Sequence, residues 1–150
     1  TARDATKQYQ SMIKIVAENK PDAKLDGALM MEMAPKGTEV ILGVIKDSSL
    51  GTMIMFGLGG IYVEVLKDVS FSIAPITKKD AERMIDSLHS SDIFKGVRGE
   101  KPADREALIE TLGRLSQLVT DFPQIIELDI NPLLALPDGA KVLDARVVIE

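Results

Sequence analysis

Two pairs of polar residues near the C-terminal end of the chain have the types and spacing of a metal site. Asp129 and Asn131 are two positions apart, and so are Asp144 and Arg146. Side chains of a β-strand alternate between its two faces, so each pair is expected on a single face. Carboxylate and amide oxygens suit Mg²⁺, which takes one or two carboxylates and completes its shell with water and phosphate oxygens. The pattern therefore makes Asp129, Asn131 and Asp144 candidate ligands of a magnesium ion.

A β-hairpin has to bring these pairs together. Asp138-Gly139 between two apolar-patterned segments predicts a turn joining strands over residues 125–136 and 141–149. The opposite face is expected to be core and carries Leu128, Ile130, Leu143, Ala145 and Val147. The solvent-facing side of an edge hairpin would show the same alternation, so the pattern alone leaves both interpretations open.

The position of the turn sets the register of this hairpin. With a two-residue turn at Asp138-Gly139, Asn131 faces Arg146. Asn131 and Asp144 are then diagonal neighbours with backbones roughly 7–8 Å apart, within reach of a shared ion.

A second group of residues has the character of a base-binding corner. Residues 28–33 and 38–46 are expected to form strands on either side of Pro35-Lys36-Gly37. Backbone amides just before Pro35 can meet a flat heterocycle, with methionines as its apolar walls. Glu39 would project nearby and could accept hydrogen bonds from a ribose. The same methionines could instead be ordinary core residues.

Two further features carry weaker signals. The run Gly57-Leu58-Gly59-Gly60 would let backbone amides approach a phosphate, but it matches no dinucleotide-binding or P-loop pattern and could equally be a bend. His89 is the single histidine, in His-Ser-Ser-Asp, and four consecutive residues cannot form a nucleophile–base–orienter triad. We interpret His89 as a residue at the C-terminal end of a helix.

The remaining elements define the fold class. Helices are expected over residues 3–18, from the capping box at Thr77 to about Leu88, and from Pro102 to about Phe122, where the apolar stripe is Leu108, Leu112, Leu115 and Val119. Residues 52–56 and 69–73 are expected to be strands. Strands in hairpin order with helices grouped apart predict an α+β fold with a largely antiparallel sheet and packed helices.

Composition narrows the possible functions. The 150 residues are 45% hydrophobic and 27% charged, without cysteine, which fits one globular domain and a reducing, cytoplasmic setting. The net charge of −5 and scattered Lys and Arg argue against a nucleic-acid partner, and no apolar run is long enough for a membrane span. The chain starts without Met inside a helical pattern, so we expect it to be part of a longer protein.

Five stretches in order resemble the C-terminal lobe of an ATP-grasp domain, as in the ADP-forming acyl-CoA (acetate–CoA) synthetases related to the beta subunit of succinyl-CoA synthetase. The stretches are residues 31–47, 55–65, 96–99 (Gly-Val-Arg-Gly), 127–133 (Glu-Leu-Asp-Ile-Asn-Pro-Leu) and 143–146 (Leu-Asp-Ala-Arg). The resemblance implies that residues 1–150 are that C-terminal lobe.

The resemblance also implies roles for individual residues. The adenine-holding hinge corresponds to Glu32, Met33, Ala34 and Pro35, and the ribose-binding carboxylate to Glu39. Asn131 and Asp144 correspond to Mg²⁺ ligands, with Asp129 beside them. The glycine-rich segment that faces phosphoryl transfer corresponds to Gly57 to Gly60 and Glu64. Within it, Gly59 and Gly60 are the residues expected to bind the nucleotide. The role of Arg146 stays open.

The implied cofactors are ATP or ADP and Mg²⁺, in the reaction acyl-CoA + ADP + phosphate ⇌ acid + CoA + ATP through an acyl phosphate and a phosphorylated His. The implied partners are an N-terminal ATP-grasp lobe and a CoA-binding subunit or domain that carries that His, which His89 does not match. Without opposing cations, the chain alone is expected to bind the Mg²⁺–nucleotide complex weakly and to catalyse no reaction.

Alternative functions also stay open. A succinate- or malate-CoA ligase subunit and the ligase-like domain of a protein acyltransferase belong to the same enzyme class. A non-catalytic nucleotide-sensing or subunit-docking module is the alternative outside that class. The acyl acid is not predicted.

Overall fold

The chain forms two compact units. The computed structural model describes residues 1–60, 67–96 and 99–150. The first unit is Thr1–Met33 and the second is Ala34–Glu150, which contains the whole β-sheet.

The first unit is built around one helix. α1 spans Ala2–Asn19 and begins with a capping box, in which the Thr1 hydroxyl and the Asp4 carboxylate satisfy each other's backbone N–H groups. The predicted helix is confirmed, but none of its residues is buried.

The predicted strand over residues 28–33 is wrong. The segment is extended without strand pairing, and its apolar side chains are exposed: Leu29 by 85%, Met30 by 80% and Met33 by 91%. A strand needs a neighbour to satisfy its backbone N–H and C=O groups, and the described residues provide none here. Composition alone identified the apolar character of this segment but not a pairing partner.

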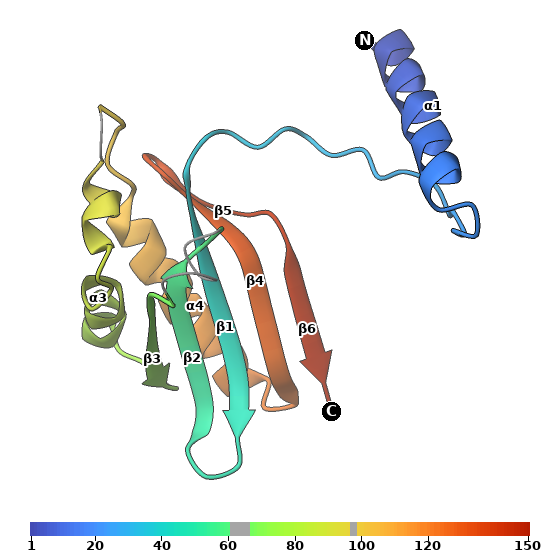
Figure 1. Cartoon of the computed structure of the whole chain (residues 1–150). Coiled ribbons are helices and arrows are strands. Elements are labelled where there is room, and N and C mark those ends of the chain that lie inside the picture. The colour runs from blue at the N-terminus through green and yellow to red at the C-terminus, as the bar shows by residue number, and fades with distance from the viewer. Residues whose placement is uncertain (61–66, 97–98) are drawn as a thin grey trace. The chain divides into compact units, whose positions relative to one another are not determined.

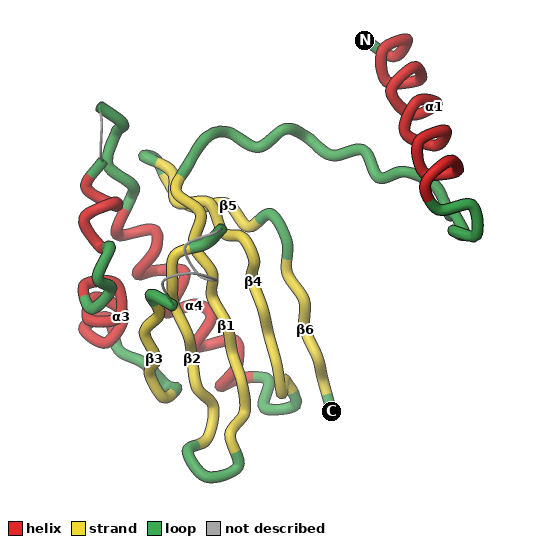
Figure 2. The backbone as a smooth tube through the Cα atoms, viewed as in Figure 1, coloured by secondary structure: helices red, strands yellow, loops and turns green. Residues whose placement is uncertain are grey.

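The second unit contains an antiparallel sheet, as the sequence predicted. Its strand order is β3-β2-β1-β4-β5, and β6 also pairs with β4 (Figures 1 and 2). The strands are β1 Thr38–Asp47, β2 Gly51–Leu58, β3 Val69–Ile73, β4 Ile125–Leu136, β5 Gly139–Val142 and β6 Ala145–Ile149.

Two helices cover one face of this sheet (Figure 1). α3 spans Lys78–Asp86, and its predicted capping box between Thr77 and Asp80 is confirmed. The short 3₁₀ helix η1 spans Ser91–Lys95. α4 spans Arg105–Asp121 and begins three residues after Pro102, because the Asp104 carboxylate caps it by accepting from the Ala107 N–H.

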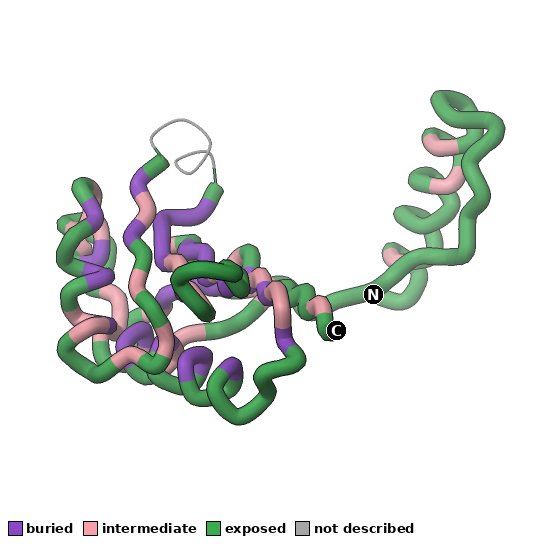
Figure 3. The backbone as a smooth tube through the Cα atoms, turned by 90° about the horizontal axis from the view of Figure 1, so that it is seen from below, coloured by how far each residue is buried: buried purple, intermediate pink, exposed green. Residues whose placement is uncertain are grey.

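The core lies between these helices and the sheet, where the buried residues gather (Figure 3). The predicted stripe of α4 (Leu108, Leu112, Leu115 and Val119) is buried there. The core face of the sheet carries Val40, Leu42, Val44, Ile54, Phe56, Leu58, Leu128, Ile130, Leu133 and Ala135. The described helices show no segment long and apolar enough to cross a membrane.

Candidate nucleotide and magnesium site

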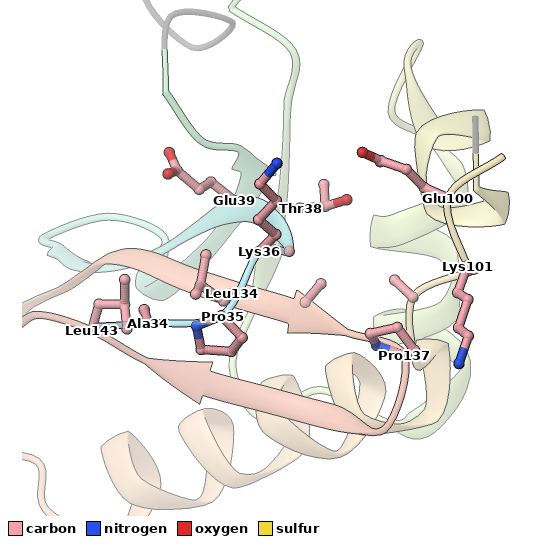
Figure 4. Close-up of a pocket in the computed structure, with 13 residues that line it drawn as sticks. Ala34, Pro35, Lys36, Thr38, Glu39, Glu100, Lys101, Leu134, Pro137 and Leu143 are labelled. Atoms are coloured by element: carbon pink, nitrogen blue, oxygen red, sulfur yellow. The ribbon is translucent and has the colours of Figure 1, made fainter. Parts of the chain in front are cut away.

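A cleft of about 620 Å³ lies where the chain enters β1 (Figure 4). On one side are residues 34–39 with Leu134 and Leu143, and on the other are Glu100, Lys101 and Pro137. Glu100 extends across the cleft toward Thr38. The cleft therefore has an apolar floor from the sheet and charged groups on its rim, which is the composition of a small-molecule site.

Half of the four-residue hinge predicted for adenine lines this cleft. Ala34 and Pro35 are lining residues. Glu32 and Met33 belong to the first unit and do not line it. The adenine role of these four residues stays a prediction.

Gly37 fixes the path of the chain beside the cleft. A Cβ atom at this position would lie 2.7 Å from Leu136 Cδ2 and 2.8 Å from the Ala135 carbonyl oxygen. Only a glycine allows the backbone to pass β4 this closely. The tight passage holds Ala34 and Pro35 over the end of β4.

Glu39 lies at the junction of the cleft and a second cavity. The second cavity is about 430 Å³ and is lined by Gly37, Thr38, Glu39, Leu58, Gly59, Gly60, Ile93 and Glu100. The Glu39 side chain is exposed to solvent, as its predicted ribose role requires. The role itself stays a prediction.

The two predicted glycines lie directly against Glu39. The Gly59 N–H donates to the Glu39 carbonyl oxygen at 2.7 Å. A Cβ on Gly59 would come within 2.9 Å of the Glu39 Cβ and carbonyl carbon, and one on Gly60 within 3.3 Å of Glu39 Oε2. Gly60 also has a φ of +65°, which favours glycine. Gly59 thus lies against the main chain of Glu39 and Gly60 beside its carboxylate, while Gly57 and Leu58 are the last residues of β2. Glu64 lies outside the described residues.

The predicted hairpin forms, but its turn is not at Asp138-Gly139. Leu136 pairs with Gly139, so Pro137 and Asp138 are the turn residues. Proline favours the second position of a four-residue turn and glycine the fourth, and Gly139 has a φ of +142°. This preference of Pro137 outweighs the Asp-Gly signal and shifts the register by two residues.

The shifted register brings Asn131 and Asp144 directly opposite each other. Asp129 pairs with Arg146, in place of the predicted pairing of Asn131 with Arg146. In the same register the Asn131 N–H donates to the Asp144 carbonyl oxygen at 3.1 Å, and the Leu143 N–H donates to the Pro132 oxygen at 3.0 Å. A shift by two keeps every side chain on its predicted face. Asn131 and Asp144 are therefore closer neighbours than the diagonal pair that we predicted.

The second strand of the hairpin is interrupted at this point. β5 ends at Val142 and β6 begins at Ala145, so residues 143 and 144 lie between strands. On β4, the peptide bond between Asn131 and Pro132 is cis, and the pairing with β1 shifts by one residue there. Proline has no N–H for the ladder and is typical of such bulges. The irregularity lies at Asn131 and Asp144, the two residues predicted to bind Mg²⁺.

One part of the predicted core face is wrong. Leu128 and Ile130 are buried, but Ala145 and Val147 on β6 are exposed. β6 pairs only with β4 and is not among the strands that pack against the helices, so its side chains stay outside the core.

Oxygen donors at the site are accessible. Asn131 and Asp144 are exposed and Asp129 is half-buried. The described residues contain no group of three His, Cys, Asp or Glu side chains that could hold a metal. Asp144, an amide and phosphate or water oxygens would nevertheless make a suitable Mg²⁺ set, so the donors fit the ion. Arg146 makes an ion pair with Glu127 at 3.2 Å, beside Asp129.

Sequence reasoning missed Glu100 and Lys101. The loop that carries them is held by two backbone bonds, from the Ala103 N–H to the Phe94 oxygen at 2.9 Å and from the Asp104 N–H to the Leu136 oxygen at 2.7 Å. Gly96, with a φ of +83°, packs tightly against Glu100. The one available signal was the preceding Gly-Val-Arg-Gly stretch, of which Val97 and Arg98 lie outside the described residues.

His89 takes no part in the cleft. Its side chain is exposed, and it follows the C-terminal end of α3 as predicted.

Comparison with known proteins identifies the family. The chain matches the ATP-grasp domain family over residues 1–149. This chain belongs to the ATP-grasp family. It is 44% identical over 146 residues to the beta subunit of the ADP-forming acetate–CoA ligase I of Pyrococcus furiosus, covering 97% of this chain and 63% of that subunit. This relative is named as a subunit of an acetate–CoA ligase.

Solved structures agree with this assignment. The dinucleotide-forming acetyl-coenzyme A synthetase 1 of Ca. Korarchaeum cryptofilum, in complex with coenzyme A and Ca-AMPCP, superposes with a TM-score of 0.84 at 41% identity, covering 96% of this chain and 63% of that one. A second structure of that protein contains coenzyme A and Mg-AMPPCP, with a phosphohistidine segment pointing towards the nucleotide-binding site. It matches with a TM-score of 0.75 at 42% identity, covering 78% of this ATP-grasp chain and 55% of that one. This chain spans under two thirds of the length of these relatives.

Proposed function

We propose that this chain is the nucleotide- and Mg²⁺-binding part of an ADP-forming acyl-CoA synthetase. The reaction is acyl-CoA + ADP + phosphate ⇌ acid + CoA + ATP. The observation that carries the proposal is the direct pairing of Asn131 and Asp144 at an interruption of the β4 hairpin. A scaffold or docking module has no need of an amide and a carboxylate held opposite each other at an accessible point.

Asn131 and Asp144 would hold Mg²⁺ through their side-chain oxygens, with Asp129 one pleat away on β4. When bound, Mg²⁺ neutralises charge on the phosphate oxygens. The cross-strand hydrogen bond between the two residues fixes their backbones opposite each other, so both side chains start from neighbouring positions.

The cleft would hold the nucleoside. Backbone groups of Ala34 and Pro35 would meet the adenine, and Leu134 and Leu143 offer it an apolar surface. Glu39 would accept hydrogen bonds from the ribose hydroxyls. Gly59 and Gly60 lie against Glu39, which lines both the cleft and the second cavity.

Phosphoryl transfer requires parts that this chain does not supply. Positioning and charge neutralisation carry that reaction. In the cleft the described cationic residues are Lys36 and Lys101, which lie near the proposed base site. We propose that a preceding ATP-grasp lobe supplies the phosphate-binding cations. A CoA-binding subunit or domain supplies the phosphorylated His, since His89 does not line the cleft. The assembly works in the cytoplasm.

An assay of ATP formation tests this function. The complete protein that contains this chain, with its CoA-binding partner, should form ATP from acetyl-CoA, ADP and phosphate only when Mg²⁺ is present. The isolated 150 residues should form none and should bind Mg·ADP only weakly, because the charge of the transition state is unmatched. Nucleotide binding by the complete assembly without ATP formation would instead support a sensing module.

A further inference from the structure

Asp68 is a buried carboxylate that the proposed mechanism does not use. Asp68 is only 3% exposed, and it is the one buried charged residue among the described residues. It directly precedes β3, at the end of the connection that begins with Gly59 and Gly60. A buried charge is costly unless it is fully hydrogen-bonded, so its partners indicate what it is for.

Both oxygens of Asp68 accept backbone hydrogen bonds from the segment between α3 and η1. Oδ1 accepts from the His89 N–H at 2.9 Å, and Oδ2 accepts from the Ser90 N–H at 2.8 Å. Burial raises the pKa of Asp68, but the Ser90 and His89 N–H groups outweigh burial, so the pKa lies below its usual value. The carboxylate is therefore ionised at neutral pH and joins two segments far apart in the sequence.

Both sides of this link adjoin the second cavity beside Glu39. On one side Asp68 lies next to the end of β2, because Val69 pairs with Gly57 and a Cβ on Gly57 would come within 3.0 Å of the Asp68 carbonyl oxygen. The residues that follow Gly57 line the cavity, and the Gly59 N–H donates to the Glu39 carbonyl oxygen. On the other side η1, which starts directly after Ser90, contributes Ile93. Asp68 therefore links the two elements whose ends form the walls of the cavity beside Glu39.

We propose that Asp68 is a positioning residue for nucleotide binding: it sets the distance between the glycine wall and the η1 wall of the cavity beside Glu39. The proposal rests on the proposed nucleotide site. Loss of one carboxylate oxygen leaves a partly buried N–H without its acceptor, and the segment that carries it shifts to find another partner. The cavity then changes width although no residue that touches the nucleotide has been altered.

Ser116 offers a matched control. It is also buried, at 3% exposed, and its hydroxyl accepts a backbone hydrogen bond, from the Ile76 N–H at 2.9 Å. It lines neither cavity. Ser116→Ala therefore causes the same kind of loss, a partly buried N–H without its acceptor, away from the site.

The test uses the complete protein with its preceding lobe and partner. Asp68→Asn keeps the volume and one acceptor, and Asp68→Ser is a second, smaller variant should the first fold poorly. We expect the Kd and KM for Mg·ADP to rise about tenfold, well below the unfolding temperature, with the KM for acetyl-CoA unchanged. Ser116→Ala should lower the unfolding temperature and change neither KM.

Three results would overturn the inference. The first is wild-type ADP affinity in a folded Asp68 variant. The second is equal rises in both KM values. The third is an ADP effect in Ser116→Ala as large as in Asp68→Asn. Failure of the wild-type protein to bind Mg·ADP would instead refute the proposed function, and this inference with it.

Discussion

At the scale of single residues, Gly59 allows the backbone after β2 to pass close to Glu39 because it has no side chain. Gly59→Ala would place a Cβ 2.9 Å from two atoms of Glu39, both part of or next to the main chain. The backbone has to move, because neither neighbour is the flexible end of a side chain. We expect a folded protein with at least about tenfold weaker Mg·ADP binding, measured by calorimetry on the complete protein.

Gly113 provides the matched control for this substitution. It lies exposed on α4 with nothing within 4 Å of a built Cβ. Gly113→Ala should leave Mg·ADP binding unchanged and stabilise the fold by about 0.5–1 kcal/mol, because alanine is the better helix residue. Unaltered nucleotide affinity in Gly59→Ala would show that Glu39 and its glycines do not contact the ligand.

Residue chemistry was visible in the sequence where a strand carries it. The two-residue spacing of Asp129 and Asn131 indicated a shared face whatever the exact register, because a shift by two preserves the face. Glu100 and Lys101 could not be found in this way. They reach the cleft through a loop closed by bonds to Phe94 and Leu136, contacts that no local pattern encodes.

At the scale of elements, the capping box of α3 is a local device whose stability can be measured. The Thr77 hydroxyl accepts from the Asp80 N–H, and the Asp80 carboxylate accepts from the Thr77 N–H at 2.8 Å. Thr77→Ala should lower the free energy of unfolding by about 0.5–2 kcal/mol in denaturant titration. Thr111→Ala on α4, where the hydroxyl only bonds back to Ala107 in the same helix, should cost nothing or stabilise.

The same box predicts a pH dependence. The Thr77 hydroxyl and backbone N–H, with Arg83, hold the pKa of Asp80 below its usual value. A carboxyl whose pKa is lowered by folding stabilises the fold above its unfolded pKa of about 3.9 and loses that contribution as pH falls through the folded pKa. Thr77→Ala should therefore differ from wild type at pH 7 and converge toward it at the acid end. A constant difference down to acid pH would show that the carboxylate contributes nothing.

Helices and strands were predictable where the sequence signal is local. The predictions failed where a pairing partner elsewhere in the chain decides the structure. Caps and apolar periodicity located α3, α4, β1 and β3. Residues 28–33 had a strand's composition but find no pairing strand in the described residues. The turn lies one residue earlier than predicted, because the preference of Pro137 for the second turn position outweighs the preference of Asp138-Gly139 for a two-residue turn.

At the scale of the whole molecule, the chain covers 63% of the length of an acetate–CoA ligase subunit to which it is 44% identical. The sheet unit presents a cleft and an accessible pair of side chains, Asn131 and Asp144, that we propose bind the metal. The cations that must face them belong, on our proposal, to the preceding lobe. Activity is thus expected to be a property of the assembly, to which this chain contributes the binding sites for the nucleotide and the metal.

Steady-state kinetics of the assembled enzyme test that claim most directly. At saturating Mg²⁺, Asn131→Ala and Asp144→Ala should each lower kcat about a hundredfold or more, as loss of a charge-stabilising group commonly does. Lys79→Ala, an exposed substitution on α3, should leave kcat unchanged. Near-wild-type rates in both alanine variants would mean that the metal is held elsewhere and would contradict the site proposed for this chain.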